Sequence, residues 1–263
     1  DSKHYGFSVR CLADEITTGT ILVPQDYPTI QAGIDAAFDG DTILVSAGTY
    51  YENINFNGKN IAVIGADRET TIIDGGQDGS VMIMDGVDVQ INGLTITNGS
   101  GTDVGNWNVG GGMYALNSNL VISNCNITDN HISRGLSDGG GIQLEGEGTV
   151  IIKNSLITNN STIGAGGGIT CANSYTQIIN CVIYGNAVSD NNPGGIWVTE
   201  DGYIEIITND KSPNEIKTPY LFNAYNYRAQ IKYKLKNYDK AMMDYSKVIE
   251  EYTINKKHYD SLV

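Results

Sequence analysis

Apolar and polar residues alternate over short stretches through most of the chain, a pattern typical of β-strands with one buried face. Three of these stretches align with one another, residues 120–130, 150–160 and 176–186, at offsets of 30 and 26 residues. Glycine-led strands precede the aligned segments and recur after them, at residues 110–113, 139–142, 166–169 and 194–196. A period of this length with short strands predicts a solenoid. The repeats show no leucine-rich consensus with a helix, so a β-helix is favoured over a leucine-rich repeat.

The alternation within one repeat assigns a direction to each side chain. The inward positions are Ile142, Leu144, Val150, Ile152, Ser155 and Ile157, and the outward positions are Gln143, Glu145 and Lys153. We therefore predict coils that stack about 4.8 Å apart and form three parallel sheets around a dry core.

Asparagine recurs at one turn of the aligned repeats, as Asn124, Asn154 and Asn180. An asparagine tolerates the left-handed conformation and can hydrogen-bond neighbouring backbone, so the recurrence predicts a stacked asparagine ladder. Cys125 and Cys181 occupy the next inward position, two coils and about 10 Å apart, which is too far for a disulfide. We interpret the cysteines as buried thiols.

The residues at the start of the solenoid show the period of an α-helix. Residues 28–38 predict a helix with Ile30, Ile34, Ala37 and Phe38 on one face. An open first coil would expose strand edges and apolar core, so we expect this helix to cover it.

Charge divides the chain into two parts. The net charge is −14. From residue 15 to residue 210 there are 22 acidic and 4 basic residues, a net of −18, whereas residues 211–263 carry 10 basic and 6 acidic residues, a net of +4. An acidic body disfavours nucleic acid and anionic membranes, and it tolerates neutral sugars or divalent cations. No apolar run approaches the roughly 18 residues of a membrane span. The first residues also lack the apolar core of a signal peptide, as expected of a processed secreted chain or of one that begins within a longer protein.

Residues 23–54 resemble the opening of the pectin-lyase-like superfamily. The glycine-led strands and the Asn-Cys-x-Ile-x-x-Asn coils resemble right-handed β-helix repeats of bacterial secreted and surface proteins. The resemblance implies a right-handed parallel β-helix over residues 20–217, at an extracellular or bacterial outer-surface location. It leaves the activity open, because the superfamily contains lyases, hydrolases, esterases, adhesins and proteins without known activity.

The two ends resemble other families. Residues 5–12 resemble the closing strand of a major paralogous domain of bacterial surface lipoproteins, which makes residues 1–19 a remnant or linker. Residues 224–249 resemble one tetratricopeptide unit, through Ala229, Tyr233, Tyr238, Ala241 and Tyr245. Residues 218–263 are accordingly expected to form a helical hairpin that either caps the last coil or belongs to a longer protein.

In relatives that cleave pectic polymers, catalytic groups lie on the outer face of one sheet, bordered by the longest turns. An inverting hydrolase needs two carboxylates roughly 6.5–9.5 Å apart, and a lyase needs a strong base. The corresponding face here supplies one carboxylate, Glu145. His131, Arg134 and Asp138 share one turn beside Glu145 and are the other catalytic candidates, although a solvated polar loop also accounts for them.

Acidic turn residues raise a second hypothesis. Asp103, Asp138 and Asp190 could bind calcium if their turns converge, and ordinary loop acidity is the alternative. No other cofactor is expected.

The outer face suits binding better than catalysis. Tyr114 and Trp197 are expected three coils apart, about 14 Å along the axis, with Gln143 and Thr170 between them and Trp107 folding over. Aromatic rings bury sugar C–H faces, and amides and hydroxyls orient sugar hydroxyls. Exposed aromatics can equally stabilise their sheet neighbours.

We therefore predict a monomeric, non-catalytic β-helix module that binds a polysaccharide or cell-surface glycan. A polysaccharide lyase or glycoside hydrolase acting on pectin-like polymers, and a passive structural spacer, are the alternatives.

Overall fold

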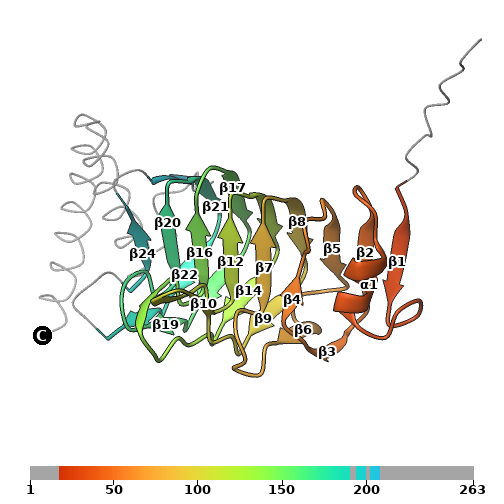
Figure 1. Ribbon diagram of the computed structural model, residues 1–263, viewed down its shortest axis with the longest axis horizontal. Helices are drawn as coiled ribbons and strands as arrows, with labels where there is room; N and C mark the ends of the chain where they lie inside the picture. The colour runs from red at the N-terminus through yellow and green to blue at the C-terminus, as the bar shows by residue number, and fades with distance from the viewer. Residues whose placement is uncertain (1–17, 190–193, 200–201, 208–263) are drawn as a thin grey trace, which may run out of the picture.

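The computed structural model describes residues 18–189, 194–199 and 202–207, which wind into a stack of parallel coils (Figure 1). Each full coil adds one strand to each of three parallel sheets, here called A, B and C, in that order along the chain. This is the right-handed parallel β-helix that the repeat predicts. The expectations for residues 5–12 and for the helical segment 218–263 lie outside the described residues.

The three sheets contain most of the strands. Sheet A consists of β1 (Thr20–Val23), β2 (Thr42–Val45), β5 (Ala62–Gly65), β8 (Asp88–Asn92), β13 (Asn119–Ser123), β17 (Thr149–Lys153), β21 (Tyr175–Ile179) and β25 (Tyr203–Ile207). Sheet B consists of β3 (Gly48–Tyr51), β6 (Thr71–Asp74), β9 (Thr95–Thr97), β14 (Asn126–Thr128), β18 (Leu156–Thr158) and β22 (Val182–Tyr184). Sheet C consists of β4 (Ile54–Asn55), β7 (Met82–Asp85), β12 (Met113–Leu116), β16 (Ile142–Glu145), β20 (Ile169–Ala172) and β24 (Ile196–Val198).

Two smaller sheets form in the loops between sheets B and C. One consists of β10 (Thr102–Val104), β11 (Trp107–Val109) and β15 (Leu136–Asp138), with β10 antiparallel and β15 parallel to β11. We call this three-stranded sheet the ridge. The other pairs β19 (Ser161–Thr162) with β23 (Ala187–Val188).

The core consists of columns of like side chains. Ile91, Ile122, Ile152 and Ile178 stack inside sheet A, and each is at most 1% exposed. All six side chains predicted to point inward are also at most 1% exposed, which confirms the in–out alternation. Burying each isoleucine contributes about 1.5–3 kcal/mol, so the stack is stabilised along its whole length.

The predicted asparagine ladder is present at the corner between sheets A and B. Asn124, Asn154 and Asn180 all have a φ of 51° and are exposed to solvent. The Nδ2 atoms of Asn124 and Asn180 donate to the Oδ1 atoms of Asn92 and Asn154, each at 3.4 Å. The superimposed rungs confirm the register on which the inward and outward assignments depend.

A second ladder, which is buried, lies at the corner between sheets B and C. It consists of Asn130, Asn160 and Asn186, and the first two are fully buried. The backbone N–H and the Nδ2 of Asn130 donate to Asn160 Oδ1 at 3.1 and 2.9 Å, and those of Asn160 donate to Asn186 Oδ1 at 2.9 and 3.0 Å. Each amide also donates to a strand carbonyl, as Asn160 Nδ2 does to Ile127 O at 2.8 Å. These bonds satisfy backbone groups where each loop leaves the coil.

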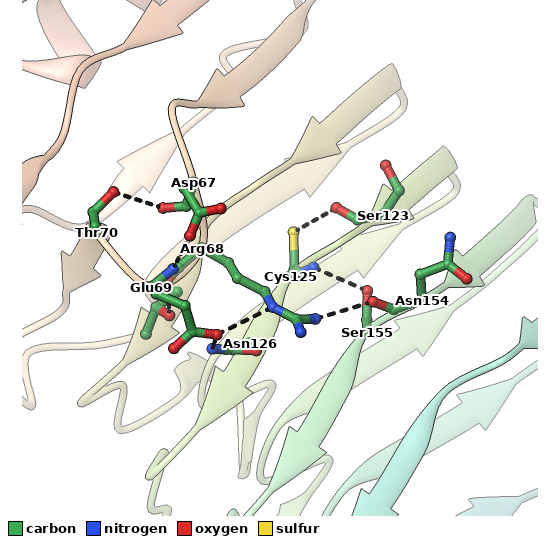
Figure 2. Close-up of polar contacts among 10 residues, drawn as sticks. Asp67, Arg68, Glu69, Thr70, Ser123, Cys125, Asn126, Asn154 and Ser155 are labelled. Atoms are coloured by element: carbon green, nitrogen blue, oxygen red, sulfur yellow. Dashed lines mark hydrogen bonds and ion pairs between the residues drawn. The ribbon is translucent and has the colours of Figure 1, made fainter.

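An arginine bridges several coils outside the A–B corner, as Figure 2 shows. Arg68 Nε binds Glu69 Oε1 at 3.2 Å, and its Nη1 donates to the carbonyl of Asn154 at 3.2 Å, 86 residues later in the chain. Beside it lies Cys125, whose N–H donates to Ser155 Oγ at 3.1 Å. Burial raises the pKa of the Cys125 thiol to about 11. Cys125 and Cys181 are free thiols, as the spacing predicts; Cys125 is buried as expected, whereas Cys181 is only half-buried.

Helix α1 (Ile30–Ala36) covers the start of the solenoid and packs on β1, β2 and β4. Ile30, Ile34 and Ala37 are buried as predicted. Phe38 was expected on the same face but is 78% exposed, because the helix ends at Ala36 and the chain becomes extended. No helix among the described residues has the length and apolar character needed to cross a membrane.

The next coil holds both ends of α1. The Glu52 carboxylate accepts the N–H groups of Ile30 and Gln31, each at 2.9 Å, and Lys59 Nζ donates to the carbonyls of Ile34 and Ala37 at 2.9 and 2.7 Å. The Gln31 side chain pairs with the edge of β4, donating to Asn55 O at 3.0 Å and accepting from Asn55 N at 2.8 Å. Helix α1, the lid of the solenoid, is therefore held by specific hydrogen bonds as well as by apolar packing.

Candidate functional site

The glycine-led strands of sheet C begin where the preceding loop folds back over the sheet. Gly110, Gly139 and Gly166 have φ values of 61°, 65° and 60°, which favour glycine. A Cβ at Gly139 would lie 2.6 Å from Ile142 O and 2.9 Å from the Cα of Gln143. The glycines thus allow the loop backbone to lie directly against the outer face of the strand that follows.

Because the loops lie over this face, they shield from solvent the side chains that were predicted to bind sugar. Tyr114, Gln143 and Thr170 point outward from the coil as expected, yet they are only 7%, 5% and 1% exposed. The expectation that they form an open groove is wrong, because the loops of the same chain occupy the space above them.

Two of these three covered side chains form hydrogen bonds with other groups of the protein. Tyr114 Oη donates to Glu145 Oε2 at 3.4 Å, and Thr170 Oγ1 donates to Ala165 O at 3.2 Å. Burial, with the nearby Glu145 carboxylate, raises the pKa of Tyr114 to about 12. The Oε1 of Gln143 is buried without a hydrogen-bond partner among the described residues.

The two tryptophans of the predicted groove line a cavity of about 300 Å³, here called the indole cleft. Trp107 starts β11 and is 44% exposed, and Trp197 lies half-buried in β24. The remaining walls come from residues 135–138 and 163–165. Asp138 lies in this wall and accepts the N–H of Ala165 at 2.7 Å, and burial raises the pKa of its carboxyl above the ordinary value.

A second cavity of about 420 Å³ lies on the other side of the ridge, here called the polar cavity. Its charged lining residues are Asp78, Asp103 and Arg134, and its amide-bearing residues are Asn53 and Asn108. Asp78 and Asn53 were not candidates from the sequence, because they belong to earlier coils whose turns are not among the longest. Their place beside Asp103 follows from the stacking of loops one coil apart.

The four catalytic candidates do not meet. His131 Nδ1 hydrogen-bonds Ser161 Oγ at 2.5 Å and is exposed, Arg134 lines the polar cavity, and Asp138 lines the indole cleft. Glu145 is half-buried beside Tyr114. In the described part of the chain, no hydrogen bond or ion pair links any two of the four. The turn at residues 131–138 spans both sides of the ridge, so sharing that turn does not bring them together.

Among the described residues, the aspartates of the calcium hypothesis do not converge. Asp103 and Asp138 line different cavities, and Asp190 lies outside the described residues. Over residues 18–189, 194–199 and 202–207, no group of three or more His, Cys, Asp or Glu side chains is placed to hold a metal ion.

Comparison with known proteins bears on the fold. A family model described as "Right handed beta helix region" matches residues 41–210. The search of curated proteins gave no match. A solved pectin methylesterase mutant in complex with a hexasaccharide has a TM-score of 0.44 and 11% identity, covering 74% of this chain and 68% of its own. Pectin methylesterase PemA from Erwinia chrysanthemi has a TM-score of 0.37 and 13% identity, covering 66% and 68%. Similarity at this level carries no argument about activity.

Proposed function

We propose that this chain, which belongs to the right-handed β-helix family, binds carbohydrate on the side of its solenoid, at the indole cleft. The observation that carries the proposal is that Trp107 and Trp197, from strands far apart in sequence, line one cavity. Indole rings bind the C–H faces of sugars by burying them, and nearby polar groups orient the hydroxyls.

The surroundings of the two rings support this use. Leu136, also in the cleft, is 57% exposed, so an apolar group lies open to solvent beside the exposed Trp107. Exposed apolar groups that gather at a cavity are typical of binding sites. Asp138 supplies an acceptor for sugar hydroxyls at the same wall.

A binding role is favoured over a catalytic one because the candidate acids and bases lie apart. Hydrolysis by two carboxylates requires both to face one substrate. Here Asp138 lies in the indole cleft, whereas Glu145 is engaged by Tyr114. The proposal includes an extracellular or cell-surface location and a monomeric solenoid.

A glycan array tests the proposal with the wild type, Trp107→Ala and Trp197→Ala. We expect at least one glycan to bind and each variant to lose about tenfold in affinity, equivalent to about 1.4 kcal/mol. Tyr51→Ala is the matched control, since Tyr51 is a 78% exposed aromatic on sheet B, away from the cleft. Unchanged binding in both tryptophan variants would contradict the proposal.

A second assay separates binding from cleavage. The protein is incubated with polygalacturonate and calcium, and unsaturated ends and reducing sugar are measured. We expect no product. Product that disappears in Glu145→Gln would replace the binding role with an enzymatic one.

A further inference from the structure

The polar cavity has no part in the binding role proposed so far. It is the larger of the two cavities that flank the ridge, at about 420 Å³ against about 300 Å³. Thr102 and Asp103 of β10 line it, together with Asn108 of β11. Ile83 of β7 places it on the outer face of sheet C.

Hydrogen-bonding groups in this cavity are available to a ligand. Within the described residues, the carboxylates of Asp78 and Asp103 and the guanidinium of Arg134 make no hydrogen bond or ion pair to another side chain. Asn108 uses its Nδ2 in a long 3.4 Å contact with the Arg134 carbonyl, and Asn53 uses its Nδ2 on Ser80 O at 3.1 Å. Their Oδ1 atoms remain as acceptors. This set of acceptors with one fork-shaped donor suits the vicinal hydroxyls of a sugar.

Strand β11 joins the two cavities. Trp107 lines the indole cleft, and its neighbour Asn108 lines the polar cavity. One short strand therefore contributes a side chain to each of the two cavities. A ligand that crosses the ridge would contact both.

The register of sheet C gives the length and direction of such a ligand. Ile83, at the polar cavity, and Trp197, at the indole cleft, occupy the same outward column, and four strand steps separate β7 from β24. At about 4.8 Å a step this is about 19 Å along the solenoid axis. One sugar ring is too short to cover that distance, whereas an oligosaccharide laid parallel to the axis is long enough.

The charge of the surface selects among oligosaccharides. Two carboxylates and one guanidinium give the polar cavity a net charge of −1, and residues 15–210 carry 22 acidic against 4 basic residues. A field of this sign repels polyanions and leaves uncharged sugars unaffected. The site therefore disfavours uronate or sulfated chains.

We infer that the polar cavity is a second sugar subsite, so that the protein binds a neutral oligosaccharide chain along its axis, across the ridge and into both cavities. The inference rests on the carbohydrate binding proposed for the indole cleft.

Binding is measured by calorimetry at low and high salt with two series of probes, cello-oligosaccharides and oligogalacturonides, each from the monosaccharide to the hexasaccharide. We expect affinity to rise with length in the neutral series until both cavities are filled, and the charged series to bind at least tenfold more weakly at low salt. Asp103→Ala and Arg134→Ala should each lower the affinity for the neutral hexasaccharide about tenfold, the value of one hydrogen bond to a charged group. The affinity for the disaccharide should be unchanged. Asp85→Ala is the matched control, because Asp85 is an exposed carboxylate on sheet C that lines neither cavity.

The outcomes separate the two proposals. If Trp197→Ala weakens short and long chains alike but Asp103→Ala and Arg134→Ala weaken neither, the indole cleft binds sugar and the second subsite is wrong. Tighter binding of oligogalacturonides than of the neutral series overturns the assignment to neutral chains. Absence of binding by every probe and on the glycan array overturns the carbohydrate role itself.

Discussion

Two corners of the coil use the same residue for different purposes. Between sheets A and B the connection is short, with β13 ending at Ser123 and β14 beginning at Asn126, and its asparagine ladder is exposed. Between sheets B and C the connections of the later coils are long, and their ladder of Asn130, Asn160 and Asn186 is fully buried at its first two residues. The short corner needs asparagine for its left-handed φ, whereas the long corner needs its amide for hydrogen bonds.

The difference explains where the protein can vary. At the long corner, backbone N–H and C=O groups lose strand partners where each loop leaves the coil, and the buried asparagine amides hydrogen-bond these groups instead. For example, Asn130 Oδ1 accepts the N–H of Gly99 at 2.9 Å. The coils therefore stay in register while the loops differ in length and sequence. All loops that form the ridge and both cavities leave from this corner. The short corner carries none of them.

The largest expected effect comes from breaking the buried ladder at its middle rung. Asn160→Ala would leave the N–H of Asn130 without its side-chain acceptor and the carbonyl of Ile127 without its side-chain donor, in a fully buried site, while Asn130 Nδ2 would keep its bond to Ile96 O at 3.1 Å. We expect a loss of about 2–6 kcal/mol in the free energy of unfolding, at about 1–3 kcal/mol for each of these two groups. Urea unfolding followed by circular dichroism measures it. Asn154→Ala is the matched control at the exposed ladder and should cost about 1 kcal/mol, the penalty of a left-handed alanine. Equal losses in the two variants would contradict the distinction between the corners.

A smaller effect is expected where the long loops rejoin sheet C. Gly139→Ala combines a left-handed φ with a Cβ 2.6 Å from Ile142 O, and we expect it to cost about 2–4 kcal/mol. Gly105→Ala provides the control, because Gly105 has a similar φ of 67° and nothing within 4 Å of the added Cβ. It should cost about 1 kcal/mol. If Gly139→Ala unfolds at the same urea concentration as Gly105→Ala, the loops do not press on the sheet.

The smallest effect concerns a carboxyl that the long loops bury. The pKa of Asp138 is raised by burial, so the folded state favours its neutral form. Below the ordinary aspartate pKa of about 3.9 the carboxyl is protonated in both the folded and the unfolded state, so it costs no stability. The cost grows as pH rises and is complete above the raised pKa of the folded state. Asp138→Asn retains the acceptor for Ala165 N and should raise the melting temperature slightly at neutral pH and leave it unchanged in acid. Asp85→Asn is the exposed control. A lower melting temperature of Asp138→Asn at neutral pH would show that the charge is stabilising.

Much of the fold could be predicted because it repeats. The inward columns and the ladder of Asn124, Asn154 and Asn180 depend on residues one period apart, and a period is visible in a sequence. The buried ladder was equally visible, since the aligned stretches 120–130, 150–160 and 176–186 all end in asparagine. Its importance was missed because sequence alone did not indicate that this position lies inside the corner.

The candidate site could be predicted only in part. Alternation gives the direction of Tyr114, Gln143 and Thr170 relative to their strands, but not what lies above them. The three-glycine runs were the available signal, because such runs permit a close approach of backbone. Which loop residues converge on a cavity depends on non-repeating turns, so the partnership of Asp78 with Asp103 had no counterpart in the sequence pattern.

The pairing of the Gln31 side chain with Asn55 affects more than the lid. In a parallel sheet alternate residues of a border strand bond outward, and in β4 both outward backbone groups belong to Asn55 and are already engaged by that amide. A neighbouring molecule therefore finds no template on this border of sheet C from which to grow a continuous fibre. A protein built from stackable layers is in this way kept from polymerising through that border.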